Sequence, residues 1–360
     1  MNDLKELFKA TADGIFSDSC TRALMDKAET GEWSDGVWRD IEQLGLTSAI
    51  DSESGELLPL ETLSIIVRAA GEHHLPLPLP ETLLAQRALF RCSQNIPSGP
   101  LSVAPIDWNQ LPALQSTKSG DWLLTGELRG VPWGRNVTAV IFVAQCDHEL
   151  KLVTLQEELP SEQGTSLAAE PRDSFKFNEL AVPKRSVTTV TREDAERMSL
   201  EGALFRSLQM VGAMGKVLNQ TVQYSQERIQ FGRPIAKFQA VQHQVAFMAT
   251  QVAASTAAVE AAINALESSL SPFEVHAAKG RASESAGICC NVSHQVHGAI
   301  GFTHEHTLHL SSRRLMTWRD EYGSETECYE WIGNAIQQVG GEGLWSFITT
   351  PQKSPVVDYA

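Results

Sequence analysis

The segment RIQFGRPIAKFQAVQHQ contains side chains that together could bind a nucleotide. Arg228 supplies a permanent positive charge, and Phe231 supplies a flat apolar surface. Gln230 and Gln239 add amide donors, while the Phe-Gly and Arg-Pro steps between them predict a turn between two helices. Such a set suits a dianionic pyrophosphate attached to an aromatic nucleotide.

The same residues also have a purely structural interpretation. Arg228 would then pair with a carboxylate on a neighbouring helix, and Phe231 would belong to an ordinary core. The spacing of the residues does not separate the two interpretations.

A second polar segment, HQVHGAIGFTHEHTLHL, lies at residues 294–310. We expect one helix to end at Gly298 and the chain to turn through Gly301 before another helix begins. Backbone N–H groups of this turn could meet an anion or a ribityl chain, with Gln295 on the rim.

Three histidines of this segment, His304, His306 and His309, could be taken for zinc ligands. No matched fourth ligand accompanies them, and the six cysteines show no CxxC spacing, so we expect a polar turn and no metal site. We also expect the cysteines to be reduced and mostly buried.

Composition excludes several classes of partner. The chain has 360 residues, 42% of them hydrophobic, and a formal net charge of −15, which disfavours binding to nucleic acid or to anionic membranes. No apolar run approaches the roughly 20 residues that cross a bilayer, and the opening MNDLKELFKATADGIF carries charges where a signal peptide is apolar. We therefore expect a cytoplasmic protein.

Three compositional zones predict an α+β multidomain fold. Residues 1–100 show helical spacing of apolar residues, and residues 101–192 contain short β-type runs such as TAVIFVAQ, which predict an antiparallel sheet. Residues 193–350 are predicted to form a helical bundle, and residues 351–360 a tail.

The predicted bundle has helical stripes that can be counted. One stripe comprises Val241, Val245, Met248, Val252, Val259, Ile263 and Leu266; another comprises Leu204, Leu208, Val211, Met214 and Leu218. Gly212 and Gly215 predict close approach of a neighbouring helix, whereas Lys279, Arg281 and Glu284 predict a solvated helix face.

Taken as a pair, RIQFGRPIAKFQAVQ and QVHGAIGFT resemble the acyl-CoA dehydrogenase family. The resemblance covers most of the chain and implies an N-terminal helical domain, a middle β-domain and a C-terminal four-helix bundle. It also implies an FAD shared between two subunits, whose phosphate side would be held by the bundle. The cofactor-binding residues implied by the resemblance are Arg228, Gln230, Phe231, Gln239, Gln295 and Gly298.

Two departures from the family pattern concern the reactive end of the flavin. The ring-side signature is missing where this chain reads LSVAPIDWNQLPALQSTKSGDW. In the resemblance, Tyr322 occupies the position of the family's usual catalytic glutamate, and Glu321 lies one residue before it. Some family members carry the glutamate on the first bundle helix instead; Gly202 occupies that position here, and Glu201 lies one residue before it. One residue of helix rotates a side chain by about 100°. We therefore assign no catalytic base and expect Glu321 and Glu201 to be solvated or ion-paired.

The chain keeps the phosphate side of the cofactor site and lacks an assigned base. In this it resembles the shorter accessory chain of heteromeric α2β2 acyl-CoA dehydrogenases that act on steroid side-chain CoA esters. The resemblance implies a longer acyl-CoA dehydrogenase-like partner, an acyl-CoA substrate, an electron-transfer acceptor and a role in steroid degradation. Two alternatives remain open: a self-sufficient homotetramer that uses Glu321 or Glu201 as base, and a flavin-free structural subunit.

Overall fold

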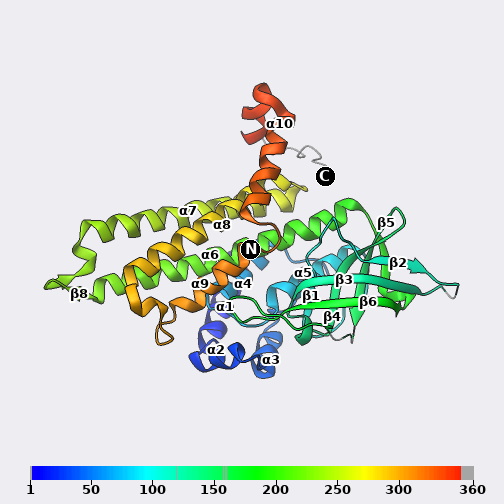
Figure 1. The fold of residues 1–360 in the computed structure, drawn as a ribbon, viewed down its shortest axis with the longest axis horizontal. Helices are drawn as coiled ribbons and strands as arrows, with labels where there is room; N and C mark the ends of the chain where they lie inside the picture. Colours follow the sequence, from blue (N-terminus) through cyan, green and yellow to red (C-terminus); the bar gives the residue numbers. More distant parts are fainter. Residues whose placement is uncertain (1, 119, 157, 159, 350–360) are drawn as a thin grey trace.

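Helices, then a sheet, then longer helices follow one another along the chain (Figure 1). The structure is a computed structural model that describes residues 2–118, 120–156, 158 and 160–349, so the predicted tail lies outside the described residues. The first helices are α1 (Asn2–Ser19), α2 (Arg22–Glu29), α3 (Asp35–Gln43), α4 (Leu60–Glu72) and α5 (Leu79–Arg91). The later ones are α6 (Arg192–Glu227), α7 (Gln239–Ser268), α8 (Pro272–His297), α9 (Leu308–Trp318) and α10 (Glu325–Thr349).

Along the chain, a seven-stranded sheet follows α5 and precedes α6. Its strands are β1 (Leu101–Val103), β2 (Ala113–Ser116), β3 (Trp122–Pro132), β4 (Ala139–Cys146), β5 (Glu149–Gln156), β6 (Arg172–Val182) and β7 (Val187–Val190). The strand order is β6-β3-β2-β4-β5-β7, and β1 pairs with β4. The sheet is mixed and not wholly antiparallel, because β1 and β2 both run parallel to β4.

Strand β4 shows why the sheet lies between two cores. Ala139, Ile141 and Val143 belong to the core that the helices share, whereas Val140 and Phe142 belong to a second core on the other face. Successive side chains of a strand point to opposite faces, so one continuous apolar run contributes to both cores. The larger core contains residues from α1, α4, α5, α6, α7, α8 and α9, which joins the helices before and after the sheet.

Helix α6 begins where the sequence carries a capping box. Thr191 Oγ1 accepts from the Asp194 N–H at 3.1 Å, and Asp194 Oδ2 accepts from the Thr191 N–H at 2.9 Å. The predicted close approach is confirmed at Gly212, where an added Cβ would lie 2.1 Å from the Arg68 carbonyl oxygen of α4. It is wrong at Gly215, where an added Cβ would have no neighbour within 4 Å.

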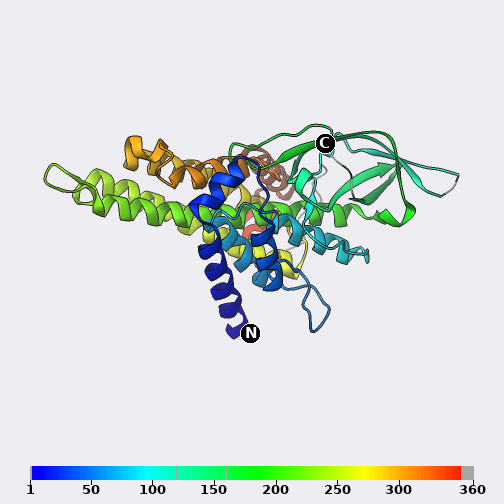
Figure 2. The same cartoon turned by 90° about the horizontal axis from the view of Figure 1, so that it is seen from below.

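Helix α7 is the one helix among the described residues whose length and hydropathy would allow it to cross a bilayer. Its stripe from Met248 to Leu266 is buried where the helix packs along α6 and α8, whereas its other face, including Phe247, is exposed. The α6–α7 connection forms the tip of the bundle, remote from the sheet in both views (Figures 1 and 2). The α6–α7 connection, which contains Arg228, is therefore far from the sheet and from the buried residues beside it (Figures 1 and 2).

Candidate functional site

The bundle tip begins at Arg228, which ends α6 and leads into a hairpin of β8 (Ile229–Gln230) and β9 (Arg233–Pro234). Phe231 and Gly232 form the turn with φ values of 51° and 77°, so both central residues have positive φ, as in a type I′ hairpin turn. Glycine adopts this conformation freely, whereas phenylalanine rarely does. The side chain of Phe231 is 91% exposed, so the interpretation that it belongs to an ordinary core is wrong.

After the hairpin, a short 3-10 turn (η3, Ile235–Lys237) leads to α7, which starts at Gln239. The residue before it, Phe238, provides no side-chain cap for the helix. The positive end of the α7 dipole therefore lies beside the exposed side chain of Gln239. An anion at this end of the bundle would meet donors from both the hairpin and the helix.

The second predicted segment reaches the same end of the molecule. Helix α8 ends at His297, and Gly298 (φ 64°, ψ −143°) starts a 3-10 turn, η4 (Gly298–Phe302). Tyr224 of α6 joins this turn to the hairpin: its hydroxyl donates to the His297 carbonyl at 3.3 Å, and its own carbonyl accepts from the Arg228 N–H at 2.9 Å.

The structure thus brings the predicted cofactor-binding residues to one exposed end of the bundle. All six are exposed: Arg228, Gln230, Phe231 and Gln239 lie between the end of α6 and the start of α7, and Gln295 and Gly298 lie at the end of α8. In the described part of the chain, the guanidinium of Arg228 forms no ion pair with a carboxylate. The alternative in which Arg228 pairs with a neighbouring helix therefore has no support in this structure.

Gly202 and Tyr322, the two positions where the family resemblance leads us to expect a base, meet at the centre of the molecule. A Cβ added to Gly202 would lie 2.3 Å from Cδ1 of Tyr322, so the tyrosine ring occupies the space in front of α6. The Tyr322 hydroxyl donates to the Val103 carbonyl of β1 at 3.1 Å. Burial raises the pKa of Tyr322 above its ordinary value, which keeps the phenol protonated.

Only about 10 Å³ of free space remains beside this tyrosine. That volume corresponds to roughly one water molecule. The lining residues are Pro80, Glu81, Leu84, Gly202, Phe205, Arg206 and Tyr322. An acyl group does not fit here without displacing the tyrosine.

A chain of alternating charges runs past Tyr322, and we call it the charge chain. Its members, in order of contact, are Glu81, Arg206, Glu321, Arg172, Glu170 and Arg314. The two guanidinium groups that flank Glu321 each donate from Nε at 2.6 Å. The charge chain connects α5, α6, the α9–α10 turn, the start of β6 and α9, and its six charges sum to zero.

Glu321 is therefore held as a carboxylate and cannot act as an efficient base. Its burial works to raise the pKa, but Arg172 and Arg206 outweigh burial and bring the pKa below the ordinary value. A catalytic base that works at neutral pH needs a pKa nearer 7.

Glu201, the other carboxylate considered as a base, is also held in its ionised form by two arginines, in a separate cluster. It is fully buried and accepts from Arg87 Nε at 3.0 Å and from Arg91 Nη1 at 3.0 Å. Burial again acts to raise the pKa of Glu201, and the two arginines lower it below the ordinary value. Its helical position also points it away from Gly202, the position that faces Tyr322.

The turn that presents Glu321 and Tyr322 is fixed by a buried lysine that the sequence does not reveal. Lys279 Nζ donates to the carbonyls of Arg319 at 2.8 Å and Gly323 at 2.6 Å, and burial lowers its pKa to about 8. The expectation of a solvated face is wrong for Lys279, because this side chain is fully buried. It is confirmed for the neighbouring pair of Arg281 and Glu284, which are 2.7 Å apart and partly exposed.

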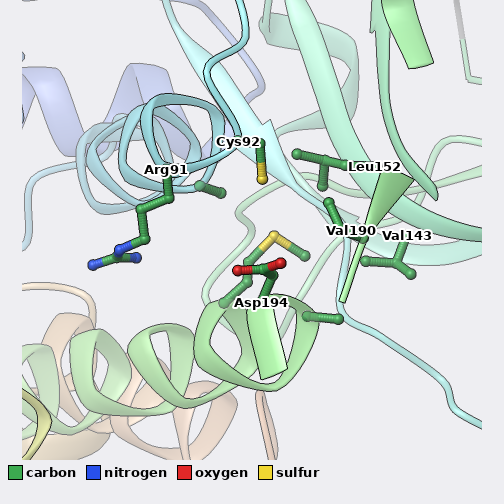
Figure 3. Close-up of a pocket in the computed structure, with 9 residues that line it drawn as sticks. Arg91, Cys92, Val143, Leu152, Val190 and Asp194 are labelled. Carbon is green, nitrogen blue, oxygen red and sulfur yellow. The ribbon is translucent and has the colours of Figure 1, made fainter. Parts of the chain in front are cut away.

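A second small cavity, shown in Figure 3, lies between α5, the sheet and α6. It holds about 10 Å³, and Cys92 and Asp194 border it while Arg91 points away (Figure 3). Such a space accommodates about one water molecule and no organic ligand.

The histidine segment lies elsewhere in the molecule, and His306 Nδ1 accepts from the Leu308 N–H. The described residues contain no group of three or more metal-ligating side chains placed to hold an ion.

Sequence reasoning missed the arginines of the charge chain. Arg206 stands inside the run GALFRSLQMVGAM, where a single charge interrupts apolar residues of a buried helix. A buried charge requires a partner, so this interruption is the signal that could have indicated the network. The identity of the partners was not accessible, since Glu81 and Glu321 lie 125 and 115 residues away along the chain.

Comparisons with known proteins found relatives in sequence and in fold. Residues 200–325 match the family model of the acyl-CoA dehydrogenase C-terminal domain. The chain is 26% identical over 323 residues to acyl-CoA dehydrogenase IpdE2 of Mycolicibacterium smegmatis, covering 87% of this chain and 93% of that protein. IpdE2 of Mycobacterium tuberculosis is 27% identical, with 78% of this chain and 80% of that protein covered.

Among solved structures, the ChsE4–ChsE5 complex from Mycobacterium tuberculosis contains a chain with a similar fold. Its TM-score is 0.85 at 18% identity, with 95% of this chain and 99% of that chain covered. At this identity the likeness establishes the fold alone. The family model thus matches the C-terminal part of the chain, and the near full-length relatives and the shared fold make the whole chain similar to acyl-CoA dehydrogenases.

Proposed function

We propose that this chain is the accessory subunit of an FAD-dependent acyl-CoA dehydrogenase and that a longer partner chain supplies the catalytic base. The observation that carries the proposal is the closed centre of the molecule. Tyr322 packs on Gly202, and the remaining space of about 10 Å³ admits no acyl thioester. A chain with this centre needs another chain for the chemical step.

The carboxylates near the centre support the same conclusion. Glu321 and Glu201 each lie between two arginines that stabilise the ionised form. Removing the α-proton of a thioester with either of them would leave two buried guanidinium groups without their full negative partner. Tyr322 is no substitute, because its raised pKa leaves no phenolate at neutral pH.

The bundle tip fits the charged tail of FAD. Arg228 would offset the pyrophosphate charge through charge-assisted hydrogen bonds, and the exposed face of Phe231 would pack on the cofactor. Gln239 at the start of α7 and Gln295 beside Gly298 would supply further donors. FAD, when bound, accepts the β-hydride of the acyl-CoA while a carboxylate takes the α-proton, giving the α,β-unsaturated thioester.

The ring end of FAD lacks its usual sequence signature on this chain, although the residues that follow β1 border a cavity of about 200 Å³. The sequence LSVAPID stands where the ring-side signature is missing, and its first three residues form β1. The Tyr322 hydroxyl donates to β1 at Val103, so the C-terminal turn covers this strand directly. We infer that the partner chain holds the isoalloxazine ring in an α2β2 assembly.

The proposed substrate class is suggested by one of the structural neighbours. One similar solved structure is described as a Tcur3481–Tcur3483 steroid ACAD variant, with a TM-score of 0.85 at 21% identity. We infer a steroid side-chain CoA ester as substrate from this likeness. The cytoplasmic location that we propose rests on the charge and composition of the chain, and reoxidation by an electron-transfer acceptor rests on the family resemblance.

The test is co-expression with a longer acyl-CoA dehydrogenase-like chain, followed by mass measurement, visible spectra and turnover. We expect Arg228→Ala to weaken FAD binding by about 10- to 100-fold, because it removes charge-assisted bonds. The control is Lys237→Ala, which removes an exposed cation from η3, the turn that follows the hairpin. Equal flavin content in both variants would contradict the proposal.

The two alternatives give different results in the same experiment. A flavin-free scaffold yields a complex whose flavin content is unchanged by Arg228→Ala. A self-sufficient homotetramer is yellow when expressed alone and loses turnover with Glu321→Gln or Glu201→Gln.

A further inference from the structure

Tyr224 connects the two segments of the bundle tip, and it has no role in the function proposed above. It lies on the last turn of α6, and its carbonyl accepts from the Arg228 N–H at 2.9 Å. Its hydroxyl donates to the carbonyl of His297, the residue before Gly298, at 3.3 Å. The backbone of Tyr224 thus continues the helix to Arg228, while its side chain reaches the residue before the glycine turn.

Ring packing reinforces this connection. The rings of Tyr224 and His297 stack with centroids 4.4 Å apart and an interplanar angle of 23°. His306 meets both rings from the side, at 4.7 Å from His297 and 6.3 Å from Tyr224. The three rings fill the space between α6 and η4.

His297 is in turn fixed from the interior of the bundle. Its ring is buried, and its Nδ1 lies 2.8 Å from the Ser293 carbonyl oxygen one helical turn earlier. One turn before Tyr224 on α6, Gln220 Nε2 donates to Thr307 Oγ1 at 2.8 Å. The final turns of α6 are therefore joined to residues on both sides of η4.

A site built from two separate segments needs a fixed separation between them. Misplacement by about 1 Å is enough to weaken a polar constellation, because its hydrogen bonds depend on geometry. We propose that Tyr224 is the positioning residue that sets the spacing between Arg228 and the Gln295–Gly298 turn for a nucleotide pyrophosphate. This inference rests on the proposed function, since it assumes that the tip binds the FAD tail.

The experiment is a double-mutant cycle on the co-expressed complex after removal of flavin, titrated with FAD and separately with ADP. Tyr224→Phe keeps the ring and removes only the hydroxyl. We expect it to weaken FAD and ADP equally, by about 3- to 10-fold, because one hydrogen bond of the framework is lost and both ligands share the tail. In an Arg228→Ala background, the same change should have a much smaller effect.

The matched control is Tyr329→Phe. Its hydroxyl donates to Glu284 Oε2 at 3.3 Å, the same length as the Tyr224 bond, but on α10. We expect no change in affinity from this variant. A thermal midpoint for each variant separates loss of folding from loss of positioning.

The outcomes separate the two proposals. If Arg228→Ala weakens FAD while Tyr224→Phe does not, the positioning role fails and the proposed function stands. The positioning role also fails if Tyr224→Phe costs the same factor in both backgrounds, because a purely structural role is additive. If Arg228→Ala has no effect, both proposals fall.

Discussion

The bundle tip and the centre of the molecule both present arginines beside helices, but their partners differ. At the centre, Arg206 and Arg172 each contact carboxylates of this chain. At the tip, Arg228 forms no ion pair among the described residues, and Arg233 lies over the Phe238 ring at 4.3 Å. A charge that is satisfied internally holds the fold together, whereas an exposed charge without a carboxylate remains available to a ligand.

The backbone differs between the two regions in the same sense. At the tip, Gly232 and Gly298 provide positive φ with nothing within 4 Å of an added Cβ. At the centre, Gly202 provides room that the Tyr322 ring fills. The glycines at the tip leave an open surface, whereas the space in front of Gly202 is closed by a side chain of the same chain.

The largest expected effect comes from breaking the charge chain. Arg206→Met leaves Glu81 and Glu321 without a shared partner, and we expect the free energy of unfolding to fall by about 3–5 kcal/mol. Chemical denaturation measures this loss. The control is Arg129→Met, which removes an exposed guanidinium from partly buried Glu127 and should cost less than about 1 kcal/mol. Similar losses in both variants would show that the charge chain is not structural.

A smaller effect is expected from crowding the centre. Gly202→Ala places a methyl group 2.3 Å from the Tyr322 ring, and overpacking of this kind costs about 1–3 kcal/mol of unfolding free energy. Adding Tyr322→Leu should restore part of the loss. On the same helix, Gly215→Ala has nothing within 4 Å and should stabilise the chain by about 0.5–1 kcal/mol. An unchanged free energy of unfolding in Gly202→Ala would contradict the interpretation that Tyr322 closes the centre.

The smallest expected effect is a dependence of stability on pH. The folded-state pKa values of Glu321 and Glu201 lie below the ordinary value of 4.5, so the unfolded chain binds protons first as the pH falls. Their stabilising contribution is therefore complete well above pH 4.5 and is lost as the pH falls through the folded pKa values. Unfolding free energies from pH 7 to pH 3 should show this decline, and Glu321→Gln should make it shallower. Equal slopes in both proteins would contradict the assignment.

Much of the fold could be predicted from local patterns. The stripe along α7 and the change to short β-type runs after residue 100 follow from periodicity, which each segment carries by itself. The parallel pairing of β1 with β4 was not predicted, because strand direction depends on residues 38 positions apart, such as Leu101 and Ala139.

For the candidate site, the motif residues Arg228, Phe231 and Gln295 could be picked out because their types and spacing express one kind of chemistry. The counting that aligned Tyr322 and Gly202 with family bases was also possible from the sequence. That these two positions touch each other, and that a ring fills the gap, required coordinates.

The sequence by itself determined the helical and strand zones, the family resemblance and the lack of a glutamate at either base position. Only the tertiary structure decided what occupies the centre and which charges pair there. The physical reason is that a buried ion pair joins residues more than 100 positions apart, and its partners are selected by packing and desolvation, which leave no local pattern in the chain.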